Sequence, residues 1–135
     1  MSLHYVAPNQ LPQAWPVAAP LLQRAINLDP SAITIEQAEY AVRTGRSYLL
    51  VWVEGEQGIT GAATIDFMDY PRERVGHINL LGGKGVVKQD VFDAVKQWMR
   101  SMGATKVQCW AKGNLVRLYE KMGMEKTHQV MRVTL

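Results

Sequence analysis

The stretch that decides the fold is RVGHINLLGGKGVVKQDVFDAVKQWMRSMGATKVQCWAKGNLVRLYEKMGM, residues 74–124. It predicts a strand at Arg74–Leu81, a glycine-rich turn, and a long helix at Val87–Met102 whose apolar residues recur three and four positions apart. A short strand at Lys106–Ala111 and a short helix at Asn114–Met122 are expected to follow. Strand, glycine turn and helix N-terminus together offer backbone N–H groups to an anionic phosphate.

Two short helices are expected before this stretch. A first strand at His4–Val6 leads into a proline-rich segment. Pro16 and Pro20 lack the N–H that a helix interior uses, so we expect the first helix to begin near them. Thr34 and Gln37 have the spacing of a capping box, which predicts the start of a second helix.

The middle and the end of the chain are predicted to form strands. Tyr48–Val53 and Ile59–Phe67 are expected to pair as a hairpin, with a bulge at Gly61. The alternating tail Glu125–Leu135 is expected to form one or two strands. The whole order predicts a mixed α/β (α+β) domain covering residues 1–135. Its sheet is mostly antiparallel and flanked by helices, with a parallel strand pair around the main helix.

Composition excludes several classes of protein. The 135 residues are 47% hydrophobic and 20% charged, as in a globular protein, and the longest apolar run is too short to span a membrane. We see no signal peptide, and the single cysteine fits a reducing compartment, so we expect a cytoplasmic protein. The net charge of +3 includes no basic run, so nucleic-acid binding is not expected. The three histidines lie far apart, and no metal site is expected.

Two patches resemble the GNAT family of acyl-CoA-dependent N-acyltransferases. Gly83, Lys84 and Gly85 match the glycine part of the family's pyrophosphate loop, although Leu80 stands where the family has arginine or glutamine. The run Leu118–Met124 is similar to the family's Leu-Tyr-x-x-x-Gly-Phe. The resemblance implies acetyl-CoA as the cosubstrate. It also implies a set of cofactor-binding residues: Leu80, Leu81, Gly82, Gly83, Lys84, Gly85, Val86 and Asn114.

The resemblance also implies a catalytic acid. In active members a tyrosine protonates the leaving CoA thiolate, and Tyr119 occupies that position. A tyrosine is protonated at neutral pH, which suits an acid. The alternative is that Tyr119 is a packed aromatic side chain on its helix.

The strand before the glycine turn is expected to alternate along its length. One face then carries Ile78 and Leu80. The opposite, open face carries His77, Asn79 and Leu81. This open face is where the substrate amine arrives in the family that the chain resembles.

A general base is less sharply predicted. His77 has the residue type that takes up a proton near neutral pH, directly or through water. Asp66 and Glu73 are alternatives that the sequence does not rank.

Two functions remain open. The first is an N-acyltransferase that moves an acetyl group from acetyl-CoA to the amine of a small molecule or a protein. The second is an inactive GNAT-like module that binds a protein partner, since Leu80 replaces the family's arginine or glutamine and no clear general base is present. The C-terminal half also looks like small GNAT-like proteins of tailed phages. The alternating tail also suggests pairing across a homodimer.

Overall fold

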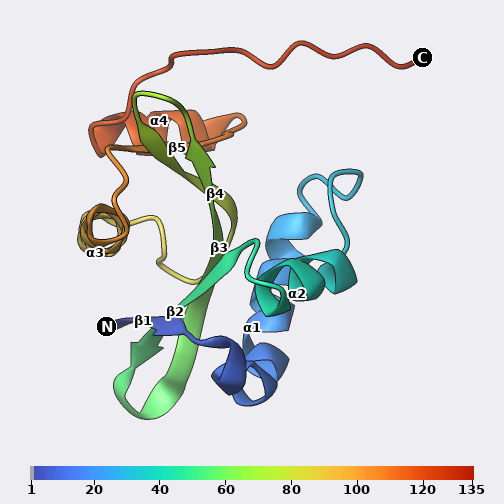
Figure 1. The fold of residues 1–135 in the computed structure, drawn as a ribbon, viewed down its shortest axis with the longest axis vertical. Coiled ribbons are helices and arrows are strands. Elements are labelled where there is room, and N and C mark those ends of the chain that lie inside the picture. The colour runs from blue at the N-terminus through green and yellow to red at the C-terminus, as the bar shows by residue number, and fades with distance from the viewer. Residues whose placement is uncertain (1) are drawn as a thin grey trace.

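The computed structural model describes residues 2–135. Within this range the strands form one five-stranded sheet in the order β1-β2-β3-β4-β5 (Figure 1). All neighbours are antiparallel except β4 and β5, which are parallel. The strands are β1 (Ser2–Val6), β2 (Tyr48–Glu54), β3 (Gly58–Asp69), β4 (Arg74–Gly83) and β5 (Lys106–Cys109). The α-helices are α1 (Leu11–Ile26), α2 (Ile35–Arg43), α3 (Gln89–Ser101) and α4 (Asn114–Lys121). The predicted fold class is confirmed, including the parallel pair.

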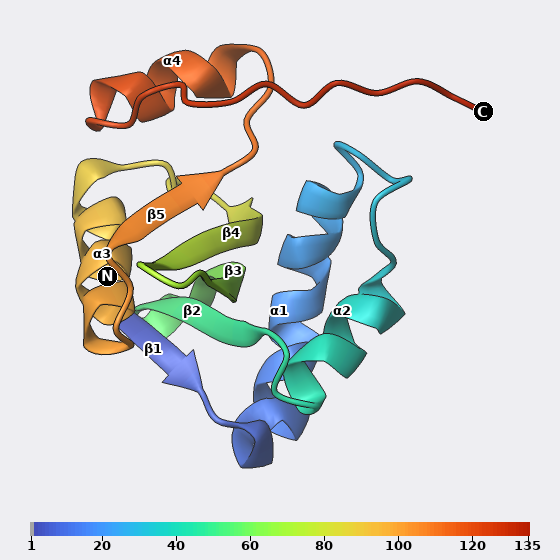
Figure 2. The same cartoon turned by 45° about the horizontal axis from the view of Figure 1, so that its top comes forward.

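The sheet separates two apolar clusters. Helices α1 and α2 lie on one face and α3 on the other (Figures 1 and 2). The first cluster includes Leu22 of α1 and Leu49 of β2, and the second includes Trp52 of β2 and Met99 of α3. All four side chains are fully buried. Alternate residues of β2 enter the two clusters, so this strand is buried on both faces.

Helix α1 begins earlier than predicted. Pro16 and Pro20 lie inside it, five and nine residues after its first residue, Leu11. Both prolines are exposed, so the carbonyl groups that lose their helical partners are on the side that water reaches. Ala18 and Leu22 are fully buried against the sheet. We infer that this packing outweighs the two missing hydrogen bonds.

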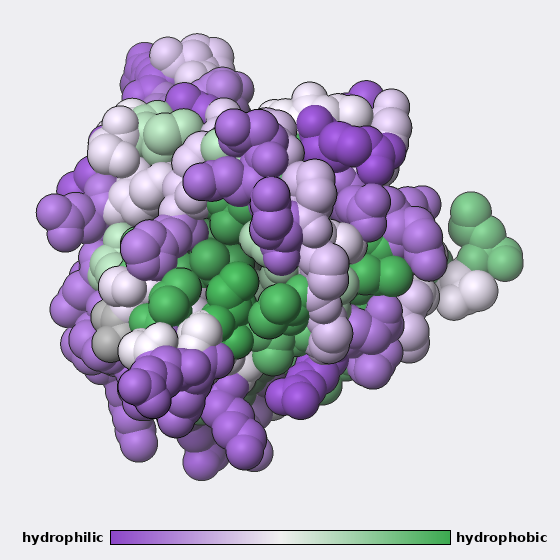
Figure 3. Space-filling model, turned by 90° about the horizontal axis from the view of Figure 1, so that it is seen from below, coloured by the Kyte–Doolittle hydropathy of each residue, from purple (hydrophilic) through white to green (hydrophobic). Residues whose placement is uncertain are grey.

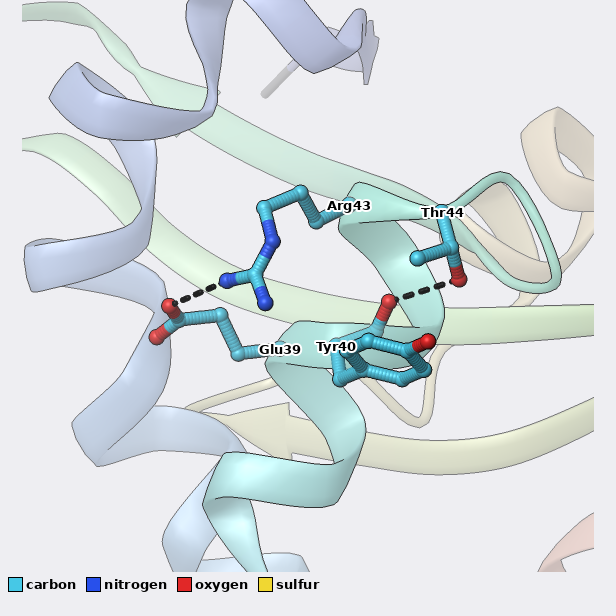
Figure 4. Close-up of polar contacts among 4 residues, drawn as sticks. All are labelled: Glu39, Tyr40, Arg43 and Thr44. Carbon is cyan, nitrogen blue, oxygen red and sulfur yellow. Dashed lines mark hydrogen bonds and ion pairs between the residues drawn. The ribbon is translucent and has the colours of Figure 1, made fainter.

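Helix α2 has both ends fixed by local contacts. The predicted capping box is confirmed, because the Gln37 N–H donates to Thr34 Oγ1 and the Thr34 N–H donates to Gln37 Oε1. At the other end Thr44 Oγ1 donates to the Tyr40 carbonyl at 2.8 Å, and an ion pair joins the last turn to the turn before it (Figure 4). The helix therefore starts where the sequence predicts, directly after Thr34.

The β2–β3 hairpin carries a bulge, but the extra residue is Thr60 and not Gly61. The pairing joins Trp52 to Gly61 and Val53 to Ile59, and it skips Thr60. The reason for glycine at 61 is space, since a Cβ there would lie 2.5 Å from Cγ1 of Val86.

The tail does not form the predicted strands. After α4 the chain is extended and without regular structure, and it runs out past the body of the molecule (Figures 1 and 2). Strand residues need a neighbouring strand to bond their N–H and C=O groups, and the tail has none. Within residues 2–135 no helix has both the length and the apolar character needed to span a bilayer.

The end of the molecule near β1 carries a shallow groove of about 580 Å³. Hydrophobic side chains gather on this side, ringed by polar ones (Figure 3). The groove is lined by His4, Tyr5, Val6, Gln10, Gln13, Ala14 and Ile59.

Candidate active site

A bulge in β4 sets the geometry of the candidate site. The pairing of β4 with β3 skips Asn79, so alternation along β4 is shifted by one residue there. Ile78 and Leu81 pack in the cluster on the α3 face, whereas Leu80 packs in the cluster on the α1 face. The prediction that Ile78 and Leu80 share a face is therefore wrong, because strict alternation does not hold across a bulge.

Beyond the bulge, β4 and β5 no longer pair. Their parallel pairing runs from Val75 and Lys106 to Ile78 and Cys109. Strand β4 continues to Gly83, whereas β5 ends at Cys109. The β5 side of the last residues of β4 is thus a free strand edge, which can bond to an extended ligand as a strand does.

The first two glycines of the predicted phosphate turn have a packing role. Gly82 and Gly83 belong to β4 and pair with β3. A Cβ at Gly82 would overlap the carbonyl oxygen of Leu21 in α1, and one at Gly83 would overlap the carbonyl oxygen of Thr60. Glycine at these positions lets β4 approach both neighbours closely.

The turn itself is formed by Lys84 and Gly85. Gly85 has a φ of 68°, which favours glycine. Lys88 is the N-cap residue of α3, and its side chain makes no cap hydrogen bond. That side chain lies across Gly85, since its Cε would be 2.8 Å from a Cβ added to Gly85. Val86 is buried and anchors the turn. Lys88 was not predicted; its place directly before the first residue of α3 is the signal that would have found it.

A small apolar cavity lies between the sheet, α3 and α4. Its volume is about 20 Å³, which is room for one water molecule. Tyr119 of α4 and Met122, directly after α4, line it together with Ile78 and Leu81 of β4 and residues of α3. This cavity lies beside the end of the β4–β5 pairing.

Tyr119 lies beside Cys109, the last residue of β5. Burial, together with the neighbouring Cys109 side chain, raises the pKa of Tyr119 to about 12. Burial also raises the pKa of the Cys109 thiol, while its contact with Tyr119 acts in the opposite direction. Both groups are therefore protonated at neutral pH. Asn114 is the first residue of α4, is exposed, and precedes Tyr119 by five positions.

The other face of the sheet carries a row of polar side chains at the same level. Asp66 of β3 is paired with His77 of β4, which is paired with Gln108 of β5. Ser47 Oγ donates to Asp66 Oδ1, and Gln108 Nε2 lies 3.0 Å from His77 Nδ1. Four side chains from separate parts of the chain thus form one line across the sheet.

His77 is buried and not open as predicted, with only 4% of its surface exposed. Burial lowers its pKa, and the Asp66 carboxylate partly offsets this effect. The imidazole is therefore neutral at pH 7, as a base must be. Trp110 covers it, with ring centroids 5.2 Å apart and the rings edge to face. Of the two alternative bases, Asp66 joins His77, whereas Glu73 is paired with Lys106 at 2.7 Å.

The structure therefore brings the predicted site residues into two groups on opposite faces of β4. Tyr119 is on the α3 face and His77 on the other, and the unpaired end of β4 lies between them. Sequence reasoning missed Ser47 and Gln108. Residues 2–135 contain no group of three or more His, Cys, Asp or Glu side chains arranged to hold a metal ion.

Comparison with solved structures identifies the fold as GNAT-like. The chain is similar to the BH1408 protein from Bacillus halodurans, with a TM-score of 0.73, 16% identity and coverage of 100% of both chains. It is also similar to the aminoglycoside acetyltransferase meta-AAC0020 from an uncultured soil metagenomic sample, solved with sisomicin, with a TM-score of 0.73, 16% identity and coverage of 99% of this chain and 95% of that one. A ribosomal-protein-alanine N-acetyltransferase from Brucella melitensis biovar Abortus 2308 gives a TM-score of 0.72 at 12% identity over 100% of both chains.

At these identities the likeness establishes the fold. No model of a protein family matches the sequence, and no curated protein matches it.

Proposed function

We propose that this protein is an N-acetyltransferase that transfers the acetyl group of acetyl-CoA to an amine in the cytoplasm. The observation that carries the proposal is the end of the β4–β5 pairing at Ile78 and Cys109, with Tyr119 on one face and His77 on the other. The solved acetyltransferases named above share the fold. Direct transfer uses a base that takes the proton of the amine and an acid that protonates the leaving sulfur.

The α3 N-terminus suits the phosphates of CoA. Lys84 and Lys88 are exposed and flank the backbone of Gly85, and the first N–H groups of α3 are not capped by a side chain. Asp90 in the first turn is the one acidic residue there. The free edge of β4 after Asn79 suits the extended pantetheine arm.

The thioester end needs more room than this structure gives. A cavity of about 20 Å³ does not hold a pantetheine arm, so α4 has to move outward. None of the residues of α4 is buried, which means that this movement breaks little packing. We therefore expect acetyl-CoA to open the site as it binds.

In the proposed reaction His77 and Tyr119, which lie on opposite faces of β4, each transfer one proton. His77 accepts the proton that the amine loses as its nitrogen bonds to the thioester carbonyl carbon. Tyr119 donates its phenolic proton to the sulfur as the C–S bond breaks, and then recovers a proton from solvent. The Gln108 amide now donates to His77 Nδ1, so Nε2 carries the proton. A half-turn of that amide lets its oxygen accept from Nδ1–H and frees Nε2 to act as the base.

The first test is binding. Acetyl-CoA at about a hundred times its dissociation constant stabilises the folded protein by about 2.7 kcal/mol. Each kcal/mol raises the melting temperature by roughly 2–8 °C for domains of this size range. We expect a clear shift that Lys88→Ala reduces and the control Lys112→Ala, an exposed lysine before α4, does not. A melting temperature unchanged at millimolar acetyl-CoA contradicts the proposal.

The second test is turnover, measured as release of the CoA thiol with a panel of primary amines. We expect Tyr119→Phe to lower kcat by roughly 10²–10⁴-fold. Tyr70→Phe, which changes an exposed tyrosine, is the matched control and should leave kcat unchanged. Equal turnover in wild type and Tyr119→Phe removes the role of Tyr119.

A second function is favoured by one observation, the closed cavity beside Tyr119. A chain that has lost its cosubstrate would keep this space filled, and leucine at position 80 lacks the side chain that the family uses there. In that case the protein is a binding module for a protein partner, of the kind found among small GNAT-like phage proteins. Absence of any acetyl-CoA shift, together with a folded chain, supports this second function.

A further inference from the structure

Two buried polar residues belong to one row across the sheet. Ser47 and His77 are 8% and 4% exposed, and Asp66 and Gln108 complete the row. Ser47 directly precedes β2, and the other three residues lie on the neighbouring strands β3, β4 and β5 (Figure 2). Burying polar side chains is costly, and apolar residues would hold the sheet together at least as well. The row therefore points to a role beyond folding.

Asp66 directly faces His77 from the neighbouring strand. The two residues are opposite each other in the β3–β4 pairing, so their Cβ atoms are roughly 4.5–5.5 Å apart. Ile65 and Phe67, on either side of Asp66, pack in the cluster on the α3 face, so Asp66 points to the other face with His77. The carboxylate thus lies on one side of the imidazole and Gln108 on the other.

The Asp66 carboxylate is held in place. Ser47 Oγ donates to its Oδ1, and the backbone N–H of Ser47 donates to the Ala41 carbonyl at 3.0 Å. Ser47 is thus fixed in the connection between α2 and β2, and it fixes the carboxylate in turn. A charge held in this way needs no rearrangement when the charge of His77 changes.

Asp66 is the charged group that acts on His77. The other charged side chains of β3, β4, β5 and the segment up to Gly113 form ion pairs: Asp69 with Arg74 at 3.3 Å, Lys106 with Glu73 at 2.7 Å, and Lys112 with Asp29 at 3.9 Å. Asp66 makes no ion pair with any residue of the described range 2–135. Its negative charge raises the pKa of His77, against the larger effect of burial.

We propose that Asp66 is a positioning residue for His77, and that its carboxylate stabilises the imidazolium that forms when His77 Nε2 takes the proton of the amine. The inference deepens the proposed function and rests on it, because it needs His77 to be the base. A buried imidazolium is costly without a neighbouring negative charge. Asp66 supplies that charge, while the oxygen of Gln108, after a half-turn of its amide, accepts from Nδ1–H. Asp66, an alternative base in the sequence, thus acts through His77.

The pKa of His77, followed by NMR of the histidine rings, tests the inference without any substrate. His77→Gln identifies the signal of His77 among the three histidines. Asp66→Asn keeps the size of the side chain and an oxygen for Ser47, but it removes the charge, so the pKa of His77 should fall. Asp69→Asn makes the same change on the same strand, at a side chain that is 72% exposed, and should leave the pKa of His77 as in the wild type. An unchanged pKa in Asp66→Asn overturns the inference.

The second readout is the pH dependence of kcat/KM, which falls on the acid side as the base of the free enzyme becomes protonated. In Asp66→Asn this fall should move to lower pH, in step with the pKa of His77 measured by NMR. We also expect kcat on the plateau to be lower by roughly tenfold or more. Asp66→Glu keeps the charge and should recover part of the loss. A loss of activity without a shift of the pH profile means that Asp66 only supports the fold, and this overturns the inference.

Failure of the inference is separable from failure of the proposed function. A wild type without turnover contradicts the proposed function, and with it the catalytic role of Asp66. An active wild type whose pH profile Asp66→Asn leaves in place overturns the inference alone. Melting curves of the variants check that each one is folded.

Discussion

Residues 2–104 and residues 105–135 follow the same rules of local structure but differ in packing. Before Thr105 the buried residues form two clusters, one on each face of the sheet. After Ala104 no residue is buried, although β5 and α4 are as regular as the elements before them. Since most of the stability of a helix in a protein comes from packing of its apolar face, α4 should be the least stable helix. The candidate site therefore lies between a well-packed part of the chain, which contains β4 and α3, and a weakly packed part, which contains β5 and α4.

The largest expected effect is a cavity in the packed part. Leu22→Ala removes a fully buried side chain between α1 and the sheet, and should lower the free energy of unfolding by about 2–5 kcal/mol. Leu118→Ala makes the same change on α4, where the side chain is 41% exposed, and should cost well under 1 kcal/mol. Urea denaturation measures both. Equal losses would mean that α4 is packed as firmly as α1.

A smaller effect is expected from glycine replacement. Gly82→Ala places a methyl group against the α1 backbone at Leu21, so α1 must shift, at about 1–3 kcal/mol or more. Gly123→Ala, after α4, meets no atom within 4 Å and is strained only by its φ of 94°. That strain is roughly 1–2 kcal/mol, and it is relieved if the end of α4 frays. The denaturation midpoint should therefore fall further for Gly82→Ala. The reverse order would contradict the close contact of β4 with α1.

The smallest effect concerns pH. Burial lowers the pKa of His77 in the folded protein, so the unfolded chain binds more protons as the pH falls below 6.5. Stability should be constant above the unfolded pKa and decrease below it, with a slope of at most about 1.4 kcal/mol per pH unit. His77→Gln should lose this slope, and His4→Gln, which changes an exposed histidine, should retain it. The same slope in all three proteins would mean that another group is responsible.

The sequence predicted the pieces of the site better than their arrangement. Tyr119 and His77 were identified as acid and base, and these roles remain predictions. The approach of Asp66 to His77 depends on the register of β3 with β4, which no local pattern contains. Trp110 is of a residue type that is mostly buried on average, yet it is 70% exposed and its ring lies against that of His77.

The errors have a common cause. The faces of β4 were wrong because the bulge at Asn79 depends on pairing with β3. Pro16 and Pro20 were misplaced because burial of the rest of α1 outweighs the two lost hydrogen bonds. In each case contacts between distant parts of the chain overrode a local preference.

The sequence by itself determined the order of the elements, the capping box of α2 and, to within two residues, the extent of α3, because each depends on periodicity or on residues a few positions apart. The parallel β4–β5 pair followed from the rule that a strand, a helix and a second strand connect as a parallel pair. Only the tertiary structure decided which face each β4 side chain takes, which residues join His77, and that Tyr119 lies beside Cys109. These depend on strand register and on packing across the sheet. Such contacts join residues far apart in the chain, so they depend on two segments at once and cannot be predicted from either segment alone.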